Sequence, residues 1–197
     1  MSQPATGPGR PRSMQFRLGD RRPCIALTAT LGDRGASQPL ERVPDPEALA
    51  RWCVEGKFLP APPKISAQEL TSMRLLREAI YRAACAVRQS RKPLAEDVAT
   101  INAWAARGTL VPELTSDGRS ADWKNERKLS PVLGTIARDA IDMLTSTSSV
   151  RIKLCADPSC RALFVDESRP GKRRWCSMNF CGNRAKSRTF ARRHRTG

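Results

Sequence analysis

Four of the seven cysteines form two pairs with equal spacing near the C-terminus. Four residues separate Cys155 from Cys160, fifteen residues follow, and four residues again separate Cys176 from Cys181. Zn²⁺ favours four tetrahedral soft ligands, and two short chelating loops brought together by a hairpin provide them at a low cost in loop-closure entropy. The spacing therefore predicts one zinc site, which constrains how the last forty or so residues can fold.

The same spacing is compatible with two disulfides or with four buried thiols that bind nothing. No segment reaches the roughly 18 apolar residues that span a bilayer, and the N-terminus lacks the apolar core of a signal peptide. We therefore expect a cytoplasmic protein with no membrane partner, in which reducing conditions disfavour disulfides. Zinc is the interpretation that paired cysteines favour. Four cysteine ligands leave no open coordination position, so this zinc would be structural.

The chain is strongly basic, and its excess charge lies at the two ends. Lys and Arg number 35 against 19 Asp and Glu, which gives a formal net charge of +16. Residues 1–22 hold five basic residues and one acidic, residues 151–197 hold thirteen and three, and residues 23–150 hold seventeen and fifteen. A nearly neutral body with basic ends is typical of proteins that contact nucleic acid.

Three segments follow from this pattern. Residues 1–22 begin with a stretch rich in Pro, Gly and Ser, and we predict a disordered basic arm. Residues 23–146 are predicted to form an α+β regulatory domain that is mostly helical, with a short strand and a hairpin. A polar linker, TSTSS, leads to residues 151–197, predicted to be a four-cysteine zinc finger with a hairpin and a basic C-terminal helix.

Apolar periodicity and capping residues predict four helices in the body. Asp45-Pro46 and Ser130-Pro131 each provide an N-cap followed by proline, and Ser66 with Glu69 has the spacing of a capping box. The apolar faces are, in chain order, Leu49, Trp52 and Cys53; Leu70, Met73, Leu76, Ile80, Ala83 and Val87; Leu94, Val98, Ile101 and Ala105; and Leu133, Ile136, Ala137, Ala140, Ile141 and Leu144. We expect these faces, with the unpaired Cys24, Cys53 and Cys85, to form a core that binds no metal or other cofactor.

Extended segments are predicted at three places. Residues 24–31, CIALTATL, form a short apolar run with β-branched residues, which we interpret as a buried strand. Between residues 109 and 128, a Ser-Asp-Gly turn separates two short runs, as in a hairpin, with Pro112 placing the first run at an edge. In the finger, residues 162–168 and 172–176 would pair across a turn at residues 169–171.

A basic helix is predicted to begin near Ser177 or Asn179, with Cys181 in its first turn, where free backbone N–H groups stabilise a thiolate. Arginines then recur at spacings of four, four and three. Because arginine holds phosphate through paired donors, we predict a nucleic-acid-binding surface. Its candidate residues are Arg173, Arg174, Arg184, Lys186, Arg188, Arg192, Arg193 and Arg195. Arg161, Lys172, Arg173 and Arg174 would offset the net −2 charge of four thiolates on Zn²⁺.

The segments LCADPSC, LFVDES and RRWCSMNFCGNRAKSR, within residues 151–193, resemble the CGNR zinc finger, which is named for residues 181–184. This resemblance implies a bacterial transcription regulator and four zinc ligands, at Cys155, Cys160, Cys176 and Cys181. Residues 24–145 are similar in length and helix order to the ABATE-type domain of stress-induced transcription regulators, which usually precedes this finger. That domain commonly carries Asp and Asn in a motif like LDLVNT, where this chain has Ala26 and Ala29. A ligand-binding role built on that polar pair is therefore not implied for this chain.

These features favour a DNA-binding transcription regulator whose body senses an effector or forms a homo-oligomer. The same charges would serve an RNA-binding protein, in which Trp175 or Phe180 would stack on bases instead of packing under the zinc, or an adaptor that docks another protein. An enzyme is the least favoured class, because the single histidine, His194, lies in the basic tail and the sequence has neither HExxH nor GxGxxG. We expect no catalytic residues.

Overall fold

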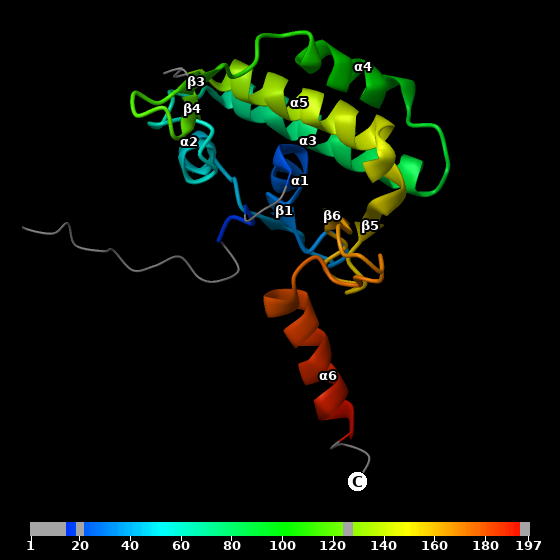
Figure 1. Ribbon diagram of the computed structural model, residues 1–197. Helices are drawn as coiled ribbons and strands as arrows, with labels where there is room; N and C mark the ends of the chain where they lie inside the picture. Colours follow the sequence, from blue (N-terminus) through cyan, green and yellow to red (C-terminus); the bar gives the residue numbers. More distant parts are fainter. Residues whose placement is uncertain (1–14, 19–21, 124–127, 194–197) are drawn as a thin grey trace, which may run out of the picture.

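The computed structural model describes residues 15–18, 22–123 and 128–193, which form a helical body and a small C-terminal finger (Figure 1). Among these residues each sheet is a two-stranded antiparallel hairpin, so the predicted α+β class is confirmed. The elements are α1 (Pro23–Thr28), β1 (Leu31–Gly32), β2 (Leu40–Glu41), α2 (Pro46–Glu55), α3 (Ala67–Arg88), α4 (Ala95–Ala105), β3 (Pro112–Leu114), β4 (Ala121–Trp123), α5 (Leu129–Thr145), the 3-10 helix η2 (Thr147–Arg151), β5 (Ile152–Leu154), β6 (Leu163–Val165), the π-helical turn η3 (Met178–Gly182) and α6 (Asn183–Arg193).

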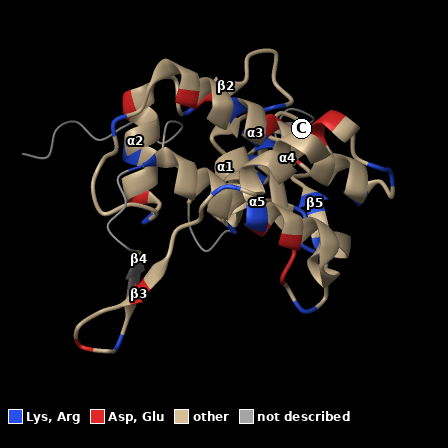
Figure 2. Cartoon of the chain, turned by 90° about the horizontal axis from the view of Figure 1, so that it is seen from above, with Lys and Arg blue, Asp and Glu red and all other residues tan. Residues whose placement is uncertain are grey.

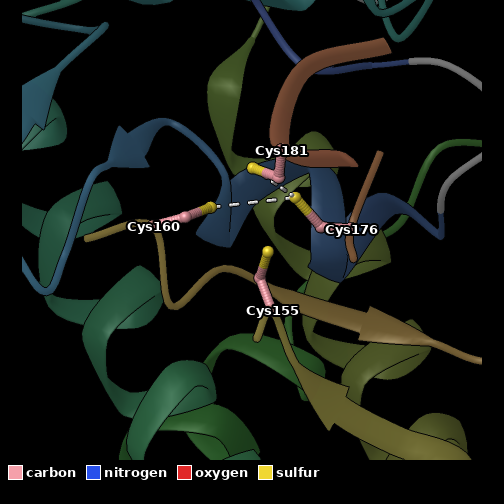
Figure 3. A group of neighbouring side chains, drawn as sticks. All are labelled: Cys155, Cys160, Cys176 and Cys181. Carbon is pink, nitrogen blue, oxygen red and sulfur yellow. Dashed lines mark hydrogen bonds between the residues drawn. The ribbon is translucent and has the colours of Figure 1, made fainter. Parts of the chain in front are cut away.

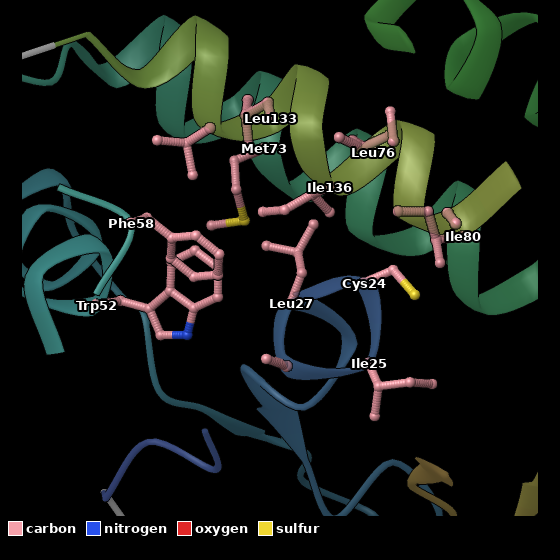
Figure 4. Close-up of a cluster of buried hydrophobic side chains, with 14 of the residues drawn as sticks. Cys24, Ile25, Leu27, Trp52, Phe58, Met73, Leu76, Ile80, Leu133 and Ile136 are labelled. Carbon is pink, nitrogen blue, oxygen red and sulfur yellow. The ribbon is translucent and has the colours of Figure 1, made fainter. Parts of the chain in front are cut away.

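The core of the body lies where α1 and α2 meet the long helices α3 and α5. α3 and α5 run side by side, α4 covers them on one side and α1 packs on the other (Figure 1). Trp52 of α2 stacks on Phe58 with ring centroids 5.0 Å apart, and both rings face the apolar side chains of α3 and α5 (Figure 4). Large side chains from these four helices are fully buried, among them Ile25, Leu27, Leu49, Met73, Leu76, Ile80, Leu133 and Ile136.

The predicted strand at residues 24–31 is wrong, because Pro23–Thr28 forms helix α1. Pro23 fits the first helical turn, where its missing N–H would have no partner in any case. The backbone N–H of Cys24 donates to the Asp139 carboxylate of α5 at 2.9 Å, and Arg22 binds the same carboxylate at 2.8 Å. Residues 24–28 are all buried. An apolar run without a polar face shows no helical periodicity, which is why its sequence resembles a buried strand.

Local capping signals predicted two helix starts correctly. The Asp45 carboxylate accepts a hydrogen bond from the Ala48 backbone N–H at 2.7 Å, and Pro46 follows as the first residue of α2. Ser66 and Glu69 form the expected capping box at the start of α3. The Ser66 hydroxyl accepts from the Glu69 N–H, while the Glu69 carboxylate accepts from the Ser66 N–H at 2.8 Å.

Two other helix predictions need correction. α5 begins at Leu129 with Lys128 as its N-cap residue, so Ser130 lies inside the first turn and does not cap the helix. On α4, Leu94 and Val98 are 54% and 41% exposed, and of the predicted face only Ile101 is fully buried. Asp97 is buried on this helix instead, because its carboxylate pairs with Arg82 of α3.

The predicted body hairpin is confirmed: β3 pairs with β4, and Pro112 is the first residue of its strand. In the finger, β6 pairs with β5, which precedes the first cysteine, so the predicted pairing of residues 162–168 with 172–176 is wrong. The TSTSS segment belongs largely to η2. The predicted disordered arm, residues 1–22, lies for the most part outside the described residues. Of its described part, Phe16 and Leu18 pack against the core. No helix in the described parts of the chain is long and apolar enough to cross a lipid bilayer.

The two serines at the starts of α3 and α5 allow a matched test of the caps. We expect Ser66→Ala to lower the free energy of unfolding by about 1 kcal/mol, because it removes a capping hydrogen bond. Ser130→Ala should change it by less than about 0.5 kcal/mol, since Ser130 is not a cap. Urea denaturation followed by circular dichroism measures both. Equal losses in the two variants would contradict this assignment of the caps.

Candidate metal centre and basic helix

Backbone hydrogen bonds within the finger bring the four cysteines together (Figure 3). Cys155 directly follows β5, and its N–H donates to the Ala162 carbonyl at 2.8 Å, which closes the loop that carries Cys160. The Ala156 N–H donates to the Arg174 carbonyl at 2.9 Å and so places the segment that leads to Cys176. All four side chains are buried.

The sulfur positions match a tetrahedral zinc site. Each Sγ lies within 4.8 Å of the other three. Cys176 Sγ lies 3.8 Å from Cys160 Sγ and 3.7 Å from Cys181 Sγ. Four sulfurs at a Zn–S distance of about 2.3 Å in a tetrahedron stand about 3.8 Å apart. These cysteines therefore fit Zn²⁺, and they are the ligand set that the spacing predicted.

Cys181 lies at the start of the C-terminal helix, as predicted. The chain enters the π-helical turn η3 after Ser177 and continues as α6. The pKa of the Cys181 thiol is lowered: the neighbouring Cys155 acts against the shift, while Cys160, Cys176 and the hydrogen bond from Arg184 favour the thiolate. The Arg184 guanidinium lies 3.5 Å from Cys181 Sγ. It therefore provides positive charge beside a metal ligand.

The loop between the first two cysteines holds the base of α6 through a buried carboxylate, Asp157. The Ser159 N–H and hydroxyl donate to it at 3.2 and 2.9 Å. Arg184 Nε lies 2.8 Å and Arg188 Nη2 3.1 Å from Asp157 Oδ2. Burial alone would raise the pKa of Asp157, but the bonds from Ser159 and Arg188 and the charge of Arg184 lower it. The first two turns of α6 are thus fixed to the loop between Cys155 and Cys160.

A second buried carboxylate, Asp166, fixes the other half of the finger. It accepts hydrogen bonds from Lys153 Nζ at 2.7 Å, from the Arg173 N–H at 2.8 Å, and from the Ser168 N–H and hydroxyl. The Lys153 ammonium holds the pKa of this carboxyl well below its usual range. These bonds join β5, β6 and the chain leading to Cys176 in place of the strand that we predicted there.

The structure places the predicted nucleic-acid-binding residues in two groups. Arg173 and Arg174 lie on the finger: Arg173 donates to the carbonyls of Trp175 and Cys176 at 2.9 and 2.6 Å, and Arg174 lies over the Trp175 ring at 5.0 Å. The second group lies on α6, which projects away from the body (Figure 1). Arg184 and Arg188 pair with Asp157, Lys186 is exposed, Arg192 and Arg193 lie in the last turn, and Arg195, like His194, lies outside the described residues.

Residues of the body also reach the metal centre, which the sequence did not predict. Arg42, from the segment after β2, lines a small cavity together with Arg184 and three of the cysteines, Cys160, Cys176 and Cys181. Asp33, after β1, lies 3.5 Å from the Arg184 guanidinium. No spacing rule links residues 33 and 42 to a cysteine cluster more than a hundred positions away, so these contacts carry no signal in the sequence.

Four clustered cysteines, a hairpin and a following helix define a zinc-finger protein. The comparisons with known proteins agree: residues 151–194 match the CGNR zinc finger, and residues 21–147 match the ABATE family, described as "Putative stress-induced transcription regulator". No curated protein matches the chain. The chain thus belongs to the ABATE family and carries a C-terminal CGNR zinc finger, as the resemblance predicted. Within the described residues, one zinc site is found, formed by Cys155, Cys160, Cys176 and Cys181.

Loss of one ligand should therefore abolish zinc binding. We expect Cys176→Ser to purify with less than one zinc per chain and to lose the ordered finger, because this segment depends on the metal for folding. Cys85→Ser is the control, since Cys85 is half-buried on α3 and lies outside the sulfur cluster. Metal analysis by mass spectrometry, on protein kept reduced, measures both. Full zinc content in Cys176→Ser would rule out this ligand set.

Proposed function

We propose that this protein is a bacterial, cytoplasmic, DNA-binding transcription regulator in which α6 contacts the DNA. The observation that carries the proposal is the placement of α6, which starts at the zinc centre and projects away from the body (Figure 1). Residues 183–193 include five basic residues and no acidic one. A charged helix fixed at one end and projecting at the other suits a groove lined by phosphates.

The dimensions of α6 support duplex DNA as the partner. Eleven residues at 1.5 Å each give a helix about 16 Å long, and the B-DNA major groove, about 12 Å wide, admits one α-helix. The body differs in charge from this helix, since both basic and acidic residues are spread along its chain (Figure 2). We therefore assign the DNA contact to the finger and leave the body to regulation by an effector or by self-association.

The basic residues of α6 have different roles in this proposal. Arg184 and Arg188 fix the helix, since both pair with the buried Asp157. Lys186 is exposed and suited to phosphate contact, and Arg192 and Arg193 follow on the same helix. The zinc has a structural role in this proposal, because four cysteine ligands leave no open coordination position for a substrate.

Single-stranded RNA is the less favoured partner because two finger aromatics that could stack on bases have other contacts. The Trp175 and Phe180 rings pack against the buried cysteine cluster. Arg174 lies over the Trp175 ring, and Arg17 lies 3.4 Å from the centroid of Phe180. Stacking on unpaired bases would require these cations to move.

The salt dependence of binding tests the proposal. We expect the full-length protein to bind a duplex oligonucleotide with an affinity that falls steeply as salt rises, because binding releases counterions from DNA. Lys186→Ala should weaken binding and reduce the slope of log K against log salt by about 1, as expected for one lost phosphate contact. Fluorescence anisotropy at several salt concentrations measures both quantities.

The matched control is Lys92→Ala, an exposed lysine in the loop between α3 and α4, for which we expect no change in affinity or slope. Three outcomes would count against the proposal: no duplex binding at low salt, an unchanged slope in Lys186→Ala, or better competition by single-stranded RNA than by duplex DNA. The last would favour the RNA alternative, and the first would favour the adaptor.

A further inference from the structure

A cavity of about 300 Å³ lies where the C-terminal end of α3, the loop that follows it and the start of α4 meet. This loop lies at the right of Figure 1 and connects two helices that pack along each other. All residues that line the cavity belong to the body, so the cavity is separate from the metal centre and from α6. Its volume is at the small end of the range for ligand pockets.

One wall of this cavity includes Arg82, whose guanidinium is held by the buried carboxylate of Asp97. Asp97 is 1% exposed, and Arg82 Nε donates to both of its oxygens at 3.1 Å. Arg82 Nη2 donates to Asp97 Oδ1, while Nη1 makes no hydrogen bond to any residue that the structure describes. Because the guanidinium is planar, fixing two nitrogens also fixes the third. A cation is thereby preorganised at the cavity.

Two further cations, Arg91 and Lys92, line the cavity from the loop between α3 and α4. Backbone hydrogen bonds fold this loop back onto α3: the Arg91 N–H donates to the Ala86 carbonyl at 2.9 Å, and the Ser90 N–H donates to the Val87 carbonyl at 2.8 Å. Neither the Arg91 nor the Lys92 side chain forms an ion pair with any described residue. Both charges are therefore available to a ligand.

The charges around the cavity do not cancel. Three basic side chains and the one carboxylate of Asp97 leave a formal charge of 3 − 1 = +2. Burial raises the pKa of the Cys85 thiol, so this lining residue is neutral at pH 7 and adds no negative charge. Glu96, next to Asp97 on α4, is exposed and does not line the cavity. Arg88, near Cys85 at the end of α3, adds to the positive potential.

Apolar surface lies beside these cations. Tyr81 and Leu94 also line the cavity. The Tyr81 ring is fixed, because its hydroxyl donates to the Arg161 carbonyl at 3.0 Å and the Arg34 guanidinium lies 3.9 Å from the ring centroid. Leu94 is 54% exposed, so part of its side chain can contact a ligand. A cavity with converging cations and an apolar wall suits a ligand that combines an anionic group with an apolar one.

We propose that this cavity binds a small phosphate monoester, with the phosphate at Arg82, Arg91 and Lys92 and the organic group against Tyr81 and Leu94. A phosphate monoester carries a charge of about −2 at pH 7, which balances the charge of the cavity. Its oxygens accept several hydrogen bonds from guanidinium and ammonium groups at once. A carboxylate carries half this charge and has fewer acceptor atoms. The proposal does not rest on DNA binding, which we assign to α6.

Calorimetric titration of the full-length, zinc-loaded protein with phenyl phosphate tests the proposal. We expect saturable binding of one ligand per chain, tighter than the binding of inorganic phosphate or of phenol, because each of these offers only one part of the ligand. Arg91→Ala and Lys92→Ala should each weaken binding about 10-fold, as expected for the loss of one charge-assisted hydrogen bond. Arg119→Ala provides the comparison, since Arg119 is an exposed arginine in the turn between β3 and β4. Its affinity for phenyl phosphate should equal that of the wild type.

A second variant separates the shape of the cavity from its charge. Ala86 lines the cavity on α3, so Ala86→Leu fills part of it and keeps every charge. We expect this variant to weaken the binding of phenyl phosphate more than that of inorganic phosphate, because the organic group loses its space. Circular dichroism establishes that the variant is folded, and Ala86→Val replaces it if it is not.

Four results would overturn the proposal. The first is no saturable binding of phenyl phosphate at millimolar concentration, and the second is inorganic phosphate that binds as tightly as phenyl phosphate. The third is an equal loss of affinity in Arg91→Ala and Arg119→Ala, which would indicate attraction by the overall charge. The fourth is weaker duplex DNA binding in Arg91→Ala, which would assign this cation to DNA phosphates. The titrations contain no DNA, so they can fail without the proposed function failing, and the reverse is also true.

Discussion

The buried cluster of four cysteines is the constraint on which the finger depends. Apart from the cysteines, its apolar cluster contains Phe164, with Ala162, Trp175 and Phe180 packed at the edge. A core of this size cannot by itself offset the conformational entropy of some forty residues, so the finger depends on the metal and on Ile152 and Leu163, which are buried in the core of the body. Arg184 from the finger and Arg42 from the body line the same cavity as the sulfurs. The site that folds the finger therefore also orients α6 and contacts the body.

Two buried aspartates organise the strongly basic C-terminal segment. Residues 151–197 hold only three acidic residues, and two of these, Asp157 and Asp166, are buried. Asp157 pairs with Arg184 and Arg188 of α6, and Asp166 pairs with Lys153 of β5. Because these two carboxylates are buried inside the finger, its outer surface remains basic. The pairs with Asp157 also fix α6, the helix that carries much of this basic charge. In the proposed function, Arg184 and Arg188 therefore fix the helix, and other basic residues of the finger contact the DNA.

The features that the sequence predicted depend on interactions between residues close in the chain, and the features that it missed depend on interactions between distant residues. Capping at Asp45 and Ser66 and the paired cysteine spacing depend on residues within a few positions of one another, so their patterns can be read directly. The N-cap of α5 was predicted at Ser130 and lies two residues earlier, at Lys128, which is within the usual uncertainty of a helix boundary. The pairing of β5 with β6 and the approach of Arg42 to the sulfurs depend on tertiary contacts. Hydrophobic periodicity and spacing carry no information about such contacts.

The segment that the sequence described worst, residues 23–30, is also the one that joins core and metal centre. At its start, the Cys24 N–H binds Asp139 of α5. At its end, the Ala29 and Thr30 carbonyls accept hydrogen bonds from Arg42, which lines a small cavity together with three of the zinc-binding cysteines. Ala26 and Ala29, which stand where related domains carry polar residues, are both buried here. In this chain Ala29 contributes its backbone carbonyl to the contact with Arg42. The segment can therefore join the core of the body to the metal centre without a polar side chain at this position.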